Sequence, residues 1–155
     1  MGGTGGERSV FEAAGGLDGL TALAHAWHRR VLADEVVSHA FSHGFHPDHT
    51  ARLAAYWAEA LGGPSTYSET VGDQSFVLRL HSGNGEHHEM DRRALAAFVA
   101  ALDDVGLSDE GLRRALTDYF AWGIGAMDAY PDSPDDVPAG LSIPRWTWGG
   151  LTESV

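Results

Sequence analysis

The sequence lacks cysteine and lysine entirely, although it is 155 residues long. Without cysteine, disulfides, thiolate zinc sites, iron–sulfur clusters and thiol nucleophiles are excluded. Without lysine, the chain cannot form a Schiff base, and it lacks the lysine of a phosphate-binding loop. The chemistry that remains rests on histidine, the carboxylates, tyrosine and whatever cofactor a histidine can hold.

Long apolar runs and an excess of positive charge are also missing. No window of about 18 consecutive apolar residues exists, so we expect no membrane span. The segment MGGTGGERSV has no apolar stretch of the kind found in a secretory signal. The formal net charge of −12 repels the phosphates of nucleic acids. These features favour a cytoplasmic protein of one domain that binds neither nucleic acid nor membranes.

Apolar residues recur at steps of three and four along most of the chain, which predicts helices. No strand-like alternation of any length and no internal repeat is present. Ser108 is the expected N-cap of the last helix, and residues 64–73 read as a loop. The main helices are expected at about residues 17–34, 47–61, 74–81, 86–105 and 109–130. We therefore expect an all-α domain of five or six short helices over residues 9–130, after a flexible N-terminus at residues 1–8.

The C-terminal extension, residues 131–155, carries four prolines and several acidic residues. Such a composition is typical of disordered tails. The extension also contains Trp146 and Trp148, and two large aromatic rings are costly to leave in water. We therefore expect it to dock on the domain or on a second subunit, which leaves a homodimer open.

Nine histidines are present, four of them in the stretch HAFSHGFHPDH at residues 39–49. One hypothesis is direct zinc binding, because His39 and His43 are spaced as a zinc pair on a helix would be. Gly44 and Pro47 break that helix, however, and no glutamate completes a metalloprotease motif.

A second hypothesis is that the histidines lie at the surface and carry no function. It fits five of the nine, namely His25, His39, His43, His87 and His88. It fits His28, His49 and His81 poorly, because each stands in helical register with apolar residues. A buried imidazole without a hydrogen-bond or metal partner costs about 1–3 kcal/mol.

A third hypothesis is a haem pocket. A b-type haem needs an axial histidine on one side, a largely apolar wall, and space with a few polar groups on the other side. The sequence supplies three inward histidines on three predicted helices, together with the apolar residues Phe41, Phe45, Leu53 and Trp57.

Several short stretches together resemble a truncated haemoglobin, of group II. They are VFEAAGG, WHRRVLAD, HAF, LAAYWAEALGGPSTYSE, LRLH and IPRWTWGG, and they occur in the family's order from about Val10 to Met127, with a tryptophan-rich tail. The resemblance implies a truncated globin, a two-over-two helical sandwich that holds haem b and its iron. The Pro/Trp-containing extension follows that fold.

The resemblance also implies a role for each matched position. His81 matches the proximal histidine, which is the metal ligand on the haem iron. His49 matches the distal position. The positions expected to contact the haem ring are Phe41, Leu53 and Trp57. Contacts to the haem propionates are expected from Tyr67 and Arg79.

Two positions depart from the family's pattern. His28 stands where these proteins usually carry a tyrosine that hydrogen-bonds the bound ligand. Ala94 stands where group II members carry a tryptophan, thirteen residues after the proximal histidine. The resemblance therefore implies a wider distal pocket with two imidazoles, His28 and His49, either of which can also reach the iron.

Three functions stay open from the sequence. The first is a haem protein that binds dioxygen, nitric oxide or carbon monoxide at ferrous iron, with oxidation of nitric oxide to nitrate supported by an electron-donating reductase. The second is a peroxidase-like or specialised haem enzyme that uses peroxide or a small organic substrate, with His28 and His49 as catalytic groups. The third is a haem-free interaction protein that keeps the globin frame.

Overall fold

The structure is a computed structural model that describes residues 8–38, 47–83 and 87–152. Within these residues it forms seven α-helices and one short antiparallel hairpin. The elements are α1 (Val10–Ala13), α2 (Gly16–Ala33), α3 (His49–Ala60), α4 (Thr66–Thr70), α5 (Gln74–His81), α6 (His88–Asp104), α7 (Glu110–Met127), a 3-10 turn (Pro134–Asp136), β1 (Trp146–Thr147) and β2 (Gly150–Leu151). The all-α fold class expected from the sequence is confirmed.

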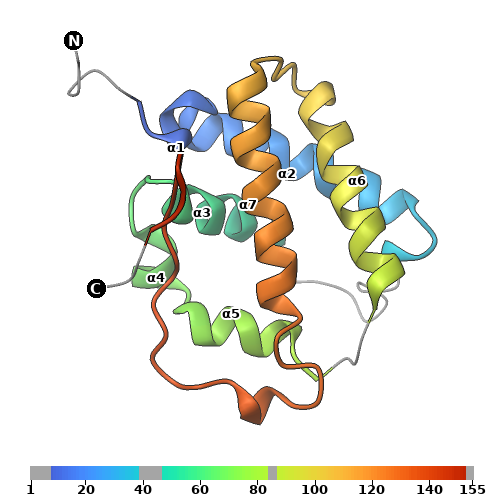
Figure 1. Cartoon of the computed structure of the whole chain (residues 1–155), viewed down its shortest axis with the longest axis vertical. Coiled ribbons are helices and arrows are strands. Elements are labelled where there is room, and N and C mark those ends of the chain that lie inside the picture. Colours follow the sequence, from blue (N-terminus) through green and yellow to red (C-terminus); the bar gives the residue numbers. More distant parts are fainter. Residues whose placement is uncertain (1–7, 39–46, 84–86, 153–155) are drawn as a thin grey trace.

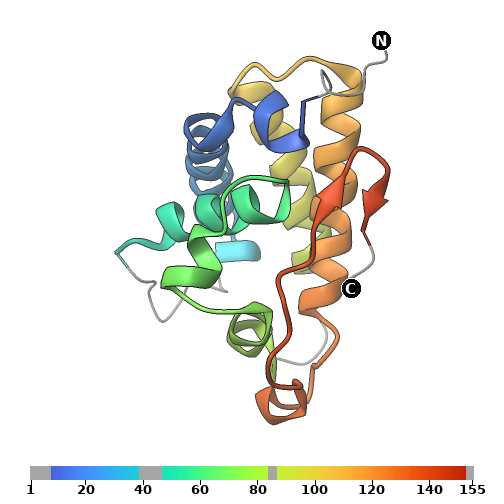
Figure 2. The ribbon, with the colours of Figure 1, turned by 90° about the vertical axis from the view of Figure 1, so that its left-hand side faces the viewer.

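Two pairs of long helices make up the body of the molecule. Helix α2 packs against α3, and α6 packs against α7, while α2 also contacts α6 and so joins the pairs (Figure 1). Helix α5 belongs to neither pair and contacts α7 and the 3-10 turn, at the end of the molecule where that turn is found (Figures 1 and 2). This arrangement is the two-over-two sandwich that the resemblance implied.

Two short helices were not predicted. Helix α1 is held by a capping box, in which Ser9 accepts from the Glu12 backbone and the Glu12 side chain accepts from the Ser9 backbone. Helix α4 lies in the expected loop, where the buried Glu59 accepts hydrogen bonds from the Ser68 backbone at 2.8 Å and from its hydroxyl at 2.6 Å. Helices of four or five residues are too short to show a period, so a local cap holds α1 and a contact from another helix holds α4.

Several helix ends differ from the expected ones by one to three residues. The N-cap of α7 is Asp109 and not Ser108, because the Asp109 carboxylate accepts from the Leu112 backbone at 2.9 Å. The helix ends at Met127, before Tyr130. Helix α3 begins at His49 and not at Pro47. The hairpin in the extension corrects the expectation of a chain without strands.

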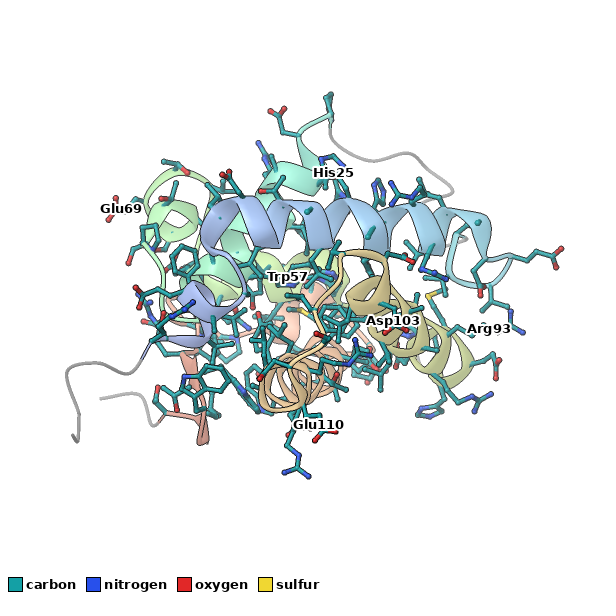
Figure 3. The ribbon with its side chains drawn as sticks, turned by 90° about the horizontal axis from the view of Figure 1, so that it is seen from above. His25, Trp57, Glu69, Arg93, Asp103 and Glu110 are labelled. Atoms are coloured by element: carbon teal, nitrogen blue, oxygen red, sulfur yellow. The ribbon has the colours of Figure 1, made fainter. Side chains whose placement is uncertain are left out.

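Four aromatic rings from four helices meet at the centre of the molecule. Trp27 and Trp57 meet edge to face at 6.3 Å, and Trp57 meets Phe98 in the same way at 5.6 Å. Phe98 stacks on Phe120 at 4.2 Å. Such pairs each contribute about 0.5–1.5 kcal/mol beyond their buried area. Figure 3 shows Trp57 inside the molecule, whereas Glu110 projects outward.

The C-terminal extension lies along its own domain. Trp146 packs on Tyr119 at 6.0 Å and on Trp122 at 5.9 Å, and the Trp148 indole N–H donates to the Arg8 carbonyl at 2.6 Å. The Arg145 guanidinium donates to two backbone carbonyls, those of Glu59 at 2.7 Å and Gly63 at 3.2 Å, and to the Ser65 hydroxyl at 3.1 Å. These contacts fasten the hairpin to the corner between α3 and α4.

Replacing Arg145 by alanine should lower the free energy of unfolding by about 1.5–3 kcal/mol, because partly buried carbonyls lose a charged donor. Denaturation by urea, followed by circular dichroism, measures this change. The matched control is Arg114→Ala, since Arg114 is exposed on α7, and it should leave stability within about 0.5 kcal/mol. Equal stabilities of the two variants would show that the Arg145 contacts do not hold the extension.

Candidate functional site

His81 is the last residue of α5, and its ring has a defined protonation pattern. Its Nδ1 lies 2.8 Å from the carbonyl oxygen of Val77, one turn earlier. Burial lowers the pKa of His81 below its usual value, and the hydrogen bond to Val77 offsets this only in part. The ring is therefore neutral near pH 7, with the proton on Nδ1 donated to the carbonyl and the lone pair on Nε2.

The surroundings of His81 combine burial with access. Protein atoms surround the ring on most sides, as the lowered pKa reflects, yet its own surface is exposed to solvent. Phe76 and Leu80 on the same helix are also exposed, at 36% and 62% of their surface. Helix α5 therefore presents an accessible imidazole and two uncovered apolar side chains to the solvent.

Phe76 and Leu80 were missed by the sequence analysis. Helix α5 buries Val77 and Leu78, so its apolar residues lie on two different faces. A short helix with two apolar faces needs a packing partner on each face. Phe76 and Leu80 are four residues apart and so share one face, and this spacing was the sequence signal for the second partner.

His28 and His49 are brought together by the packing of α2 on α3. His28 is only 8% exposed, and its ring centre lies 4.9 Å from that of His49. The hydroxyl of Thr50 lies 3.2 Å from His28 Nδ1. Burial, together with the nearby His25, lowers the pKa of His28. Two imidazoles, at least one of them neutral near pH 7, therefore share one small region.

The remaining site residues predicted from the sequence have different surroundings. Leu53 is half-buried, and Trp57 lies in the central aromatic group. Tyr67 is buried edge-on against Tyr56 at 5.3 Å, and Arg79 donates to the Val137 carbonyl at 3.2 Å. The propionate contacts expected of Tyr67 and Arg79 stay predictions. Phe41 and Phe45, like His39, His43 and His46, lie outside the described residues.

Ala94 is half-buried on α6, and its carbonyl accepts the Trp27 indole N–H at 3.0 Å. The backbone of α6 at this position is thus tied to α2, the helix that carries His28. The wider pocket expected from the small side chain of Ala94 stays a prediction.

The expectation of solvated histidines holds for His25 and His88, which are exposed. It is wrong for His87, which is half-buried between Asp91 and Asp128. The fold brings Asp128, at the end of α7, next to His87, and no pattern in the sequence near His87 indicates this contact.

A separate hollow of about 440 Å³ contains none of these residues. Its walls come from Arg8, Ala13, Asp109, Leu112 and Trp148, around α1, the start of α7 and the extension. In the part of the chain that is described, no helix combines the length and the apolar character needed to cross a membrane.

Comparison with known proteins points to one family. The model of the bacterial-like globin family matches residues 9–121. The haemoglobin of the thermophilic phototrophic bacterium Chloroflexus aurantiacus is 26% identical, with a TM-score of 0.67 over 78% of this chain and 98% of its own. A thermostable haemoglobin from the actinobacterium Thermobifida fusca is 28% identical, with a TM-score of 0.65 over 77% and 96%.

A group II truncated haemoglobin of Bacillus anthracis is 20% identical, with a TM-score of 0.67 over 82% of this chain and 95% of that one. At this identity the match concerns the fold. Together with the first two structures it confirms the resemblance to truncated haemoglobins.

The contact between Thr50 and His28 can be tested without any cofactor. Thr50→Val keeps the shape of the side chain but removes the hydroxyl, so we expect a loss of about 0.5–1.5 kcal/mol in the free energy of unfolding. Thr50→Ser keeps the hydroxyl and serves as the control. If urea denaturation of the cofactor-free protein finds the valine variant as stable as the serine variant, the hydrogen bond does not form in solution.

Proposed function

Because the chain belongs to the bacterial-like globin family and is a haem-binding globin, we propose that it holds haem b on His81 and binds diatomic ligands beside His28 and His49. Dioxygen is the ligand that we place first. The observation that carries the proposal is the state of the His81 ring, which is neutral and keeps its lone pair on Nε2.

The residues present suit this cofactor. A ring nitrogen with a lone pair is the donor that a haem iron takes, and the hydrogen bond from Nδ1 to a backbone carbonyl orients such a ligand and makes it more basic. The exposed side chains of Phe76 and Leu80 supply apolar surface beside it. When bound, haem would supply a ferrous iron that takes a diatomic ligand.

Helix α5 is held in place by contacts that do not involve the cofactor. The Tyr56 hydroxyl donates to the Gln74 side chain at 2.6 Å, and the Gln74 backbone donates to the Leu141 carbonyl at 2.9 Å. The Ser75 hydroxyl donates to the Pro138 carbonyl at 2.5 Å. Contacts from α3 and from the extension therefore help to position the helix that carries His81.

On the distal side, His28 and His49 hold and orient protons. If the Thr50 hydroxyl donates to His28 Nδ1, as the 3.2 Å separation allows, then His28 carries its own proton on Nε2. An imidazole N–H directed at the outer atom of the ligand, where negative charge collects, contributes about 1.5–3 kcal/mol. That energy slows the loss of the ligand roughly tenfold to a hundredfold.

Oxidation of nitric oxide to nitrate is the reaction that this arrangement would support when dioxygen is the first ligand. It needs an electron-donating reductase to return the protein to the ferrous state. The part played by His28 and His49 is to retain dioxygen until nitric oxide arrives.

Peroxidase-like chemistry is the second candidate, and the small side chain of Ala94 favours it. A neutral distal imidazole accepts a proton from peroxide and returns it to the leaving oxygen. With alanine in place of tryptophan, this position would leave room for a small organic co-substrate. Steady-state turnover of hydrogen peroxide with a reducing co-substrate separates the candidates, because a rate no better than that of free haem rejects this one.

Replacing His81 by alanine should abolish the Soret band of the protein reconstituted with haem, because the axial nitrogen is lost. His25→Ala, an exposed position on α2, should retain the band. In His81→Gly, added imidazole should restore it by taking the place of the side chain. A Soret band of normal intensity and position in His81→Ala would reject His81 as the ligand. If the parent protein itself showed no Soret band after haem is added, both haem functions would be rejected and the haem-free interaction protein would be the one that remains.

Replacing His49 by alanine should raise the dissociation rate of dioxygen from the ferrous protein roughly tenfold to a hundredfold, because a hydrogen bond to the ligand is lost. Stopped-flow replacement of dioxygen by carbon monoxide measures this rate. His28→Ala tests the neighbouring ring in the same way, and His88→Ala, exposed on α6, is the control. Rates unchanged in both distal variants would contradict the distal role.

A further inference from the structure

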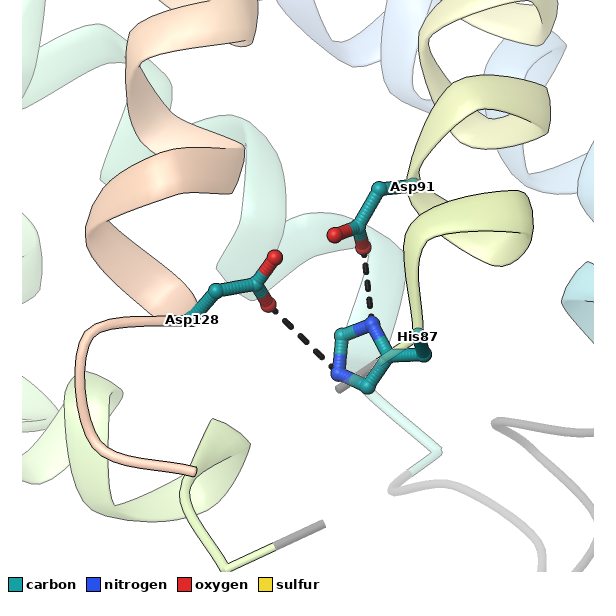
Figure 4. A group of neighbouring side chains, drawn as sticks. All are labelled: His87, Asp91 and Asp128. Atoms are coloured by element: carbon teal, nitrogen blue, oxygen red, sulfur yellow. Dashed lines mark hydrogen bonds and ion pairs between the residues drawn. The ribbon is translucent and has the colours of Figure 1, made fainter. Parts of the chain in front are cut away.

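Three side chains from two helix ends meet near the end of α5, close enough to His81 that, after burial, the charge of His87 helps to lower the pKa of the His81 ring. His87 is the N-cap of α6, Asp91 lies one turn further along that helix, and Asp128 is the C-cap of α7. The imidazole lies between the two carboxylates, with Nδ1 2.9 Å from Asp91 and Nε2 3.4 Å from Asp128 (Figure 4). All three side chains are half-buried, and one nitrogen and two oxygens lie within 4.8 Å of one another.

The 2.9 Å between His87 Nδ1 and Asp91 is an ordinary hydrogen-bond distance, whereas the spacing between His87 and Asp128 suits a shared metal ion better. A distance of 3.4 Å between Nε2 and the Asp128 oxygen is long for a charge-assisted hydrogen bond. Two ligands on a tetrahedral ion, each about 2.0–2.2 Å from the metal, lie roughly 3.3–3.6 Å apart. The imidazole and the Asp128 carboxylate are thus already separated as two ligands of one ion would be, and rotation of the Asp91 side chain supplies the third.

The charges at this point also favour a cation. No arginine among the described residues pairs with Asp91 or Asp128, since Arg92 contacts Glu89 and Arg93 contacts Glu89 and Asp34. Burial, then the hydrogen bond and charge of Asp91, raise the pKa of Asp128 to about 7. Against the effect of burial, the hydrogen bond to Asp91 and the charges of Asp91 and Asp128 also raise the pKa of His87, so a divalent ion would take the place of the proton that these carboxylates otherwise hold on the imidazole.

We propose that His87, Asp91 and Asp128 form a binding site for one divalent transition-metal ion of the zinc class. One imidazole nitrogen with two carboxylate oxygens suits zinc and its neighbours, whereas calcium and magnesium prefer oxygen ligands throughout. The partial exposure of the three residues leaves room for water in the fourth position. The ion would join the start of α6 to the end of α7.

Isothermal titration of zinc chloride into the full-length, haem-loaded protein tests the site. We expect one binding event that is at least about tenfold weaker in Asp128→Asn and in Asp91→Asn, because each loses a charged ligand. Asp118→Asn removes the same charge from an exposed position on α7 and should bind zinc as the parent does. The double variant His39→Ala/His43→Ala, within the histidine-rich segment, should also bind as the parent does.

Thermal unfolding gives a second measurement that does not depend on calorimetry. Zinc should raise the melting temperature of the parent and of Asp118→Asn, because it binds only the folded state, and this increase should be absent in Asp128→Asn. Circular dichroism confirms that each variant is folded. Absence of zinc binding by the parent would overturn the proposal, as would binding that persists in both aspartate variants and disappears in the histidine double variant.

Discussion

The contact among Trp27, Trp57, Phe98 and Phe120 is the one on which the rest of the molecule depends. Each ring comes from a different long helix, so this contact holds both helix pairs at once. His28 follows Trp27 directly, and His49 begins the helix that carries Trp57. The separation of the two distal imidazoles is therefore a consequence of how the aromatic rings pack.

Helix α5 depends on polar contacts in addition to the burial of Val77 and Leu78. It is held by polar contacts from Tyr56 and from the C-terminal extension, which meet it at Gln74, Ser75 and Arg79. The aromatic packing thus sets the distal side, whereas the proximal side combines the buried Val77 and Leu78 with hydrogen bonds to an irregular segment. A cofactor held by His81 would bridge two parts of the chain that are positioned by separate means, so the extension contributes to the site although it lies outside the helix pairs.

Much of this was accessible from the sequence, and the failures have physical causes. Apolar periodicity located the five long or amphipathic helices, and helical register marked His28 and His49 as inward-facing. Helices α1 and α4 were not predicted, because a period cannot be seen in four or five residues. Helix α4 also depends on Glu59, which lies on another helix. His87 was taken for a surface residue because its partner Asp128 is forty-one positions away in the chain.

By itself, the sequence determined which side chains are available for chemistry. Histidine is the nitrogen donor, because the chain has neither cysteine nor lysine. It also determined the helical class and the family resemblance, since both reside in local periodicity and in the order of short motifs. Only the tertiary structure decided the protonation of His81, the pairing of His28 with His49 and Thr50, and the meeting of His87 with Asp128. Those properties depend on burial and on distances between atoms of different helices, which no local pattern encodes.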